Sequence, residues 1–232
     1  MQGGFQMKNM FSYDSKLMTV LAFIGDLFIV NILYLISCAP IFTIGAAQAG
    51  LHTAMRILQD PMDGRSVVKG YFRGFKSGFG RVTLGWLLFL LFDLILGYTF
   101  FITFMYHDTG LFVHWGFPLA GLCASLVMQA VLPLFHSQFS CTFKQLLRNT
   151  LLMSVWHPLA SILTGVLMCV PLAMFLAVPD IFVEITPLFL TVYFSIASML
   201  VHLLTQKAFK ALIDNFDNPD DPEEKSVEPA EE

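Results

Sequence analysis

Five polar side chains lie inside runs of apolar residues, and they are the groups of this sequence with the most obvious chemical potential. They are Asp26, Asn31, Gln48, His52 and Asp93. Burying an ionised side chain in a bilayer costs roughly 3 kcal/mol, so each carboxylate is a candidate for a proton or cation site. Asp93 has no partner that the sequence reveals. A protonated carboxyl bonded to a neighbouring helix and a functional carboxyl are equally good interpretations of it.

Asp26 and His52 fall at equal distances from a break at residues 39–40. If the chain folds back there, the two side chains lie at similar depth, together with Asn31 and Gln48. The functional interpretation is a proton or cation site formed by these four residues. The structural interpretation, which we favour, is a polar clasp that joins two helices through hydrogen bonds.

Motifs of known catalytic and metal-binding sites are missing from the sequence. The six histidines do not have HExxH spacing, the four cysteines form no CxxC pair, and no GxSxG, Walker or dinucleotide-binding glycine motif occurs. We therefore predict no catalytic residue, no metal, no cofactor and no nucleic-acid partner, and we expect a protein that is not an enzyme.

The composition is that of a membrane protein. Hydrophobic residues make up 56% of the 232 residues and charged residues only 13%, whereas roughly a quarter of the residues of a soluble domain are charged. Nine of the 17 acidic residues lie in 214–232, with Pro219, Pro222 and Pro229. We expect residues 1–213 to form a single polytopic membrane domain, followed by a disordered acidic tail over 214–232.

Six apolar runs are long enough, or nearly long enough, to cross a bilayer of roughly 30 Å at 1.5 Å per residue. They cover residues 17–38, 41–58, 82–105, 111–135, 151–178 and 185–204. Short connections between the runs predict an all-α membrane protein in which six transmembrane helices form three hairpins. The second run is the shortest and the richest in small residues, and its 18 residues are marginal for a membrane span.

Residues 65–81 predict an amphipathic helix that lies in the membrane interface. Aromatic residues occupy one side of it and bases the neighbouring side, which is typical of a helix that binds anionic lipid headgroups. Its expected contact surface consists of Arg65, Lys69, Phe72, Arg73, Phe75 and Lys76. Gly70, Gly74 and Gly78 form a further stripe, which either admits another helix closely or only weakens this one.

The distribution of bases predicts the topology. If all six runs cross, all 13 Lys and Arg residues fall on one side of the membrane. Bases concentrate on the cytoplasmic side of membrane proteins, so we expect a multi-pass protein of the plasma membrane with cytoplasmic N- and C-termini.

Several motifs resemble the YesL-like family of bacterial integral membrane proteins, a family of unknown function. They are Gly25-Asp26-Leu27, Asn31, the segment CAPIFTIGAA at 38–47 and the segment YFRGFK at 71–76. The resemblance implies a small polytopic protein of the bacterial plasma membrane, often encoded beside sugar permeases and glycoside-degrading enzymes. It implies no catalytic residue.

Two functions are compatible with these features. The first is an accessory component of carbohydrate uptake or sensing that contacts a sugar permease or a sensor protein through its helices. The alternative is a small transporter or permease-like subunit, in which Asp26, Asn31 and Asp93 line a path through the membrane.

Overall fold

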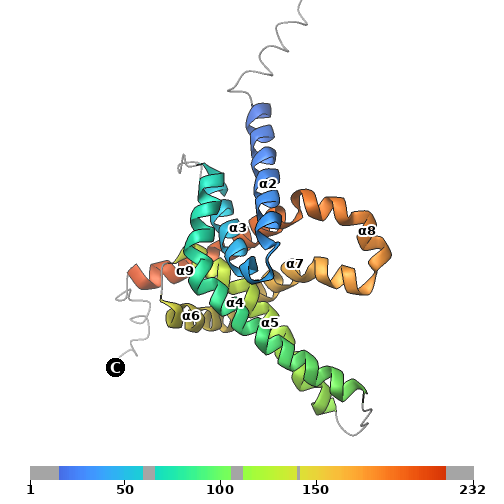
Figure 1. The fold of residues 1–232 in the computed structure, drawn as a ribbon. Coiled ribbons are helices and arrows are strands. Elements are labelled where there is room, and N and C mark those ends of the chain that lie inside the picture. The colour runs from blue at the N-terminus through green and yellow to red at the C-terminus, as the bar shows by residue number, and fades with distance from the viewer. Residues whose placement is uncertain (1–15, 60–65, 106–111, 140–141, 218–232) are drawn as a thin grey trace, which may run out of the picture.

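The computed structural model describes residues 16–59, 66–105, 112–139 and 142–217, and regular structure in these residues is helical (Figure 1). The elements are α2 (Lys16–Cys38), the 3-10 helix η1 (Ile41–Thr43), α3 (Ile44–Gln59), α4 (Val67–Met105), α5 (Phe112–Gln138), α6 (Phe143–Trp156), α7 (Pro158–Ala177), α8 (Pro179–Leu188), the π-helix η2 (Phe189–Tyr193) and α9 (Phe194–Asp217). The predicted all-α class is confirmed.

Helix α3 is the centre of the fold. Eleven of its 16 residues are buried, and it supplies side chains to both hydrophobic clusters. Ala49 packs with Val82 of α4 and Phe135 of α5 in one cluster, and Leu51 packs with Val30 of α2 in the other. The small residues that make this run weak as a membrane span are therefore the ones that let its neighbours surround it.

Helix α4 corrects the prediction of a separate interfacial helix at 65–81. The described part of that segment, from residue 67, continues without a break into the apolar run 82–105, and the two form one helix of 39 residues. The residues of α4 include no proline, and a change from polar to apolar residues does not by itself end a helix.

Four helical stretches are long and apolar enough to cross a membrane. They are Leu17–Cys38, Val67–Thr103, Gly116–Gln138 and Pro179–Gln206, and a fifth results if the bent pair Phe143–Trp156 and Pro158–Pro171 is one span. The described residues thus give four or five candidate spans and do not confirm six spans in three hairpins. Helix α3 does not meet this test.

Two prolines divide the last part of the chain differently from the predicted runs. Pro158 ends α6 because proline disfavours a helical conformation at the residue before it, and α6 and α7 meet at 107°. Pro179 likewise ends α7 and begins α8. The run predicted over 151–178 is therefore broken, and the connection predicted at 179–184 is helical.

The first residues of the predicted disordered tail are helical. Residues 214–217 belong to α9, whereas residues 218–232 lie outside the described residues. The same holds for Arg65, which belongs to the predicted contact surface.

Candidate functional site

Asn31 makes the most extensive set of side-chain hydrogen bonds to another element. Its Nδ2 donates to the backbone carbonyls of Phe189 (3.3 Å) and Leu190 (2.8 Å), and its Oδ1 accepts from the backbone N–H groups of Phe194 (3.0 Å) and Ser195 (3.3 Å). The side chain is fully buried. Asn31 therefore fastens α2 to the junction of η2 and α9.

At the π-helix Phe189–Tyr193 the backbone hydrogen bonds are spaced differently from those of an α-helix. In a regular α-helix the carbonyl of Leu190 would accept the N–H of Phe194, but here both groups bind the amide of Asn31. The side chain is inserted into the helical hydrogen-bond ladder, which is a recognised cause of local widening. Asparagine fits because its amide combines donors and an acceptor, as a peptide group does.

His52 binds α9 and not Asp26. A hydrogen bond of 2.8 Å joins its Nδ1 to Ser198 Oγ, and its ring lies 5.4 Å from that of His202, centroid to centroid, in an edge-on arrangement. His202 Nδ1 is bonded in turn to Gln138 at the end of α5 (3.2 Å). Within the described ranges, neither an ion pair nor a hydrogen bond joins Asp26 to His52, so the four residues do not form one site.

Asp26 and Gln48 lie apart from this cluster. Asp26 is partly exposed. Together with Phe23 and Leu58, it lines an open depression beside the amino-terminal half of α2. Gln48 lies beside Tyr34, and its Oε1 is buried without a hydrogen-bond partner among the described residues.

Asp93 has the helix partner that the structural interpretation requires. Gln129 Nε2 of α5 donates a hydrogen bond to Asp93 Oδ2, and Ser125, one turn before Gln129, lies close to the same carboxyl. Asp93 Oδ1 and Ser125 Oγ are buried without a hydrogen bond in the described part of the chain. The carboxyl thus joins α4 to α5 through Oδ2, whereas Oδ1 makes no hydrogen bond to the described residues.

The glycine stripe of α4 packs against α3. A Cβ atom at Gly74 would lie 2.8 Å from the carbonyl oxygen of Ala49, and one at Gly78 would lie 2.7 Å from Ala49 Cβ. On the α3 side, a Cβ atom at Gly50 would lie 2.9 Å from the carbonyl oxygen of Tyr71. Of the two interpretations of the glycine stripe, the structure therefore supports close approach of another helix.

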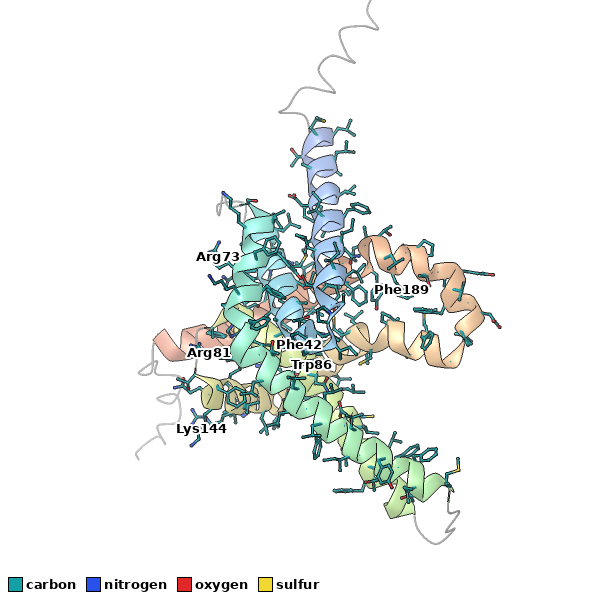
Figure 2. All side chains as sticks on the ribbon, in the orientation of Figure 1. Phe42, Arg73, Arg81, Trp86, Lys144 and Phe189 are labelled. Atoms are coloured by element: carbon teal, nitrogen blue, oxygen red, sulfur yellow. The ribbon has the colours of Figure 1, made fainter. Side chains whose placement is uncertain are left out.

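The opposite side of α4 is exposed, and we call it the basic-aromatic face. It consists of Lys69, Phe72, Arg73, Lys76 and Phe79. Figure 2 shows Arg73 projecting from the outer side of α4. Phe75, predicted as part of this surface, is instead partly buried and stacks on Tyr71.

Comparison with known proteins bears on the centre of this fold. Residues 27–100 match the family described as "Protein of unknown function, DUF624". This segment is similar to DUF624 proteins. It includes Asn31, α3, the glycine stripe, the basic-aromatic face and Asp93, and it confirms the resemblance noted from the motifs. The search found no significant match to the chain among curated proteins or among solved structures.

The partners of these polar residues were not predicted. Asn31 binds backbone atoms, which have no sequence signature, and Ser198 and His202 lie about 150 residues from His52. The spacing of Ser198 and His202, one turn apart on one helix face, was the available signal.

Proposed function

We propose that this chain is a non-enzymatic, multi-pass protein of the bacterial plasma membrane that assists carbohydrate uptake or sensing. It acts by contact with a partner membrane protein, either a sugar permease or a sensor. The YesL-like resemblance supplies the carbohydrate context. The proposed topology has six crossings and cytoplasmic termini, with α3 as a short crossing enclosed by protein.

The basic-aromatic face is the observation that carries this proposal. Lys69, Arg73 and Lys76 are exposed beside Phe72 and Phe79 on a helix whose opposite side is fixed to α3. Aromatic residues and arginine are the side chains that most often supply binding energy in protein interfaces. A rigid helix that presents them is suited to recognition of a partner, because little conformational freedom is lost on binding.

The polar groups inside the fold support the same function. Asn31 uses both ends of its amide between α2 and α9, and Asp93 bonds to Gln129. Side chains committed to joining helices are poorly suited to release and rebind an ion during transport.

Copurification from native membranes tests this proposal. The tagged protein is expected to recover a sugar permease subunit or a sugar sensor, identified by mass spectrometry, and the pair Phe72→Ala and Phe79→Ala is expected to reduce recovery at least fivefold. The pair Phe92→Ala and Phe101→Ala is the matched control, since these phenylalanines are equally exposed on the other half of α4.

Two outcomes contradict the proposal. The first is equal recovery of the partner with both pairs of substitutions. The second is sugar or proton flux by the purified protein in liposomes that is lost with Asp26→Asn or Asp93→Asn, which would show a transporter.

A further inference from the structure

A pocket of about 440 Å³ lies where the end of α3, the first half of α4 and the end of α5 meet. Three arginines from two helices line it, namely Arg56, Arg73 and Arg81, and its lining includes no carboxylate. Volumes of this size are typical of small-molecule sites. The concentration of positive charge in one concave site predicts an anionic ligand.

The pocket contains groups that are already held in place. Arg56 donates a hydrogen bond to the backbone carbonyl of Ser137, which fixes its guanidinium group at the end of α5. Ser77 Oγ donates to the carbonyl of Gly74 (3.0 Å) and lies 3.3 Å from His136 Nε2. Donors that are fixed before binding lose less conformational entropy when a ligand arrives.

The histidine of the pocket wall is held in place by Ser77. His136 Nδ1 is buried and has no hydrogen-bond partner among the described residues. Since the hydroxyl proton of Ser77 is used on Gly74, the geometry favours an Nε2–H that donates to Ser77 Oγ. Nδ1 is then an acceptor that lacks a donor, but it is buried inside the wall, so a ligand in the pocket meets the arginines and the side of the ring instead.

We propose that this pocket binds a phosphate-bearing anion. Planar guanidinium groups match the oxygens of phosphate in pairs, and Arg56, Arg73 and Arg81 line this pocket. The ligand is therefore either a soluble phosphate monoester or the headgroup of an anionic phospholipid. The pocket shares Arg73 with the basic-aromatic face, but its other lining residues lie outside that face.

Calorimetric titration of the purified full-length protein in neutral detergent tests this inference. The probes are glycerol 1-phosphate, inorganic phosphate and short-chain phosphatidylglycerol. The pair Arg73→Gln and Arg81→Gln is expected to weaken binding at least tenfold. The pair Lys144→Gln and Arg148→Gln removes the same charge from exposed positions of α6 outside the pocket, and it is expected to change binding less than twofold.

Each outcome has a definite meaning. Binding of the soluble phosphates identifies a soluble ligand, and binding of phosphatidylglycerol alone identifies a lipid headgroup; either result supports the site. Absence of binding by all three probes, or equal weakening by both pairs, overturns it.

A third variant covers the case in which the arginine pair does not fold. A Cβ atom at Gly80 would meet no atom within 4 Å, so Gly80→Asp adds a carboxylate to the pocket without a clash and should likewise abolish binding. The titration uses the purified protein without a partner. A negative titration therefore overturns the phosphate site but does not contradict the proposed contact with a permease or sensor, which copurification tests.

Discussion

At the scale of single residues, the side-chain amide of Asn31 joins α2 to η2 and α9 through four hydrogen bonds. Two donors and one acceptor of its amide meet two carbonyls and two N–H groups of one helix. A buried group that loses its hydrogen-bond partner costs about 1–3 kcal/mol. Replacement of Asn31 is thus more costly than the loss of one ordinary contact.

We expect Asn31→Asp and Asn31→Leu to lower the free energy of unfolding by about 2–3 kcal/mol. The carboxylate brings negative oxygens against two carbonyls, and leucine removes the hydrogen bonds that the Asn31 amide makes to four backbone groups. Thermal unfolding in detergent measures the effect. Asp26→Asn is the control on the same helix, because Asp26 is partly exposed, and a loss of stability as large as that of Asn31→Asp would refute this account.

The sequence indicated which residues matter here but not how they pair. Asn31 and His52 stood out because polar groups in apolar runs need partners. Their partners lie on η2 and α9, far along the chain. Depth in a hairpin predicted Asp26 opposite His52, but it does not determine which face of a helix a side chain occupies.

At the scale of elements, the seam between α3 and α4 is fixed by residues without side chains. Gly74 and Gly78 of α4 meet Ala49, and Gly50 of α3 meets Tyr71. Backbone contact of this kind holds membrane helices together without a hydrophobic driving force. It also explains why α3 is so fully buried.

Two glycine substitutions in α4 are expected to have opposite effects. Gly74→Ala places a Cβ atom against Thr53 and the carbonyl of Ala49, and should lower the melting temperature in detergent. Gly97→Ala meets no atom within 4 Å and should raise it, since alanine favours a helix over glycine by about 1 kcal/mol. Equal effects of the two changes would show that helix propensity, not packing, governs the seam.

The sequence showed the four-residue spacing of the glycines in α4 and the small residues of α3, against which these glycines pack. The length of α4 was not. Its predicted boundary at residue 81 followed polarity, but α4 contains no proline at that point, and Gly78 and Gly80 do not end the helix. The break at Pro158, in contrast, could have been predicted, because proline disfavours a helical conformation at the residue before it.

At the scale of the whole molecule, the arrangement of bases predicts orientation. Lys69, Arg73, Lys76 and Arg81 all precede the apolar half of α4, and Lys144 and Arg148 lie on α6. Clustering of bases near the ends of spans sets the cytoplasmic side. The pocket and the basic-aromatic face would then share that side.

Cysteine labelling in intact cells tests the orientation. In a chain whose four native cysteines are replaced, Ser66→Cys should react with an impermeant reagent only after the membrane is permeabilised. Asp180→Cys, at an exposed position of α8, should react in intact cells. Modification of Ser66→Cys from outside would reverse the proposed topology and the location of the basic-aromatic face.

The insertion of Asn31 into the π-helix has a consequence for biogenesis. The backbone atoms that it binds are 158 or more residues downstream, and ribosomes add about 5–20 residues per second. The first helix must therefore wait on the order of 10–30 s with its amide unmatched before the last helices emerge. Assembly is completed from the carboxyl end, so a nascent chain cut short before residue 189 would keep the packing of α2 on α3 but would lack all four hydrogen bonds of Asn31.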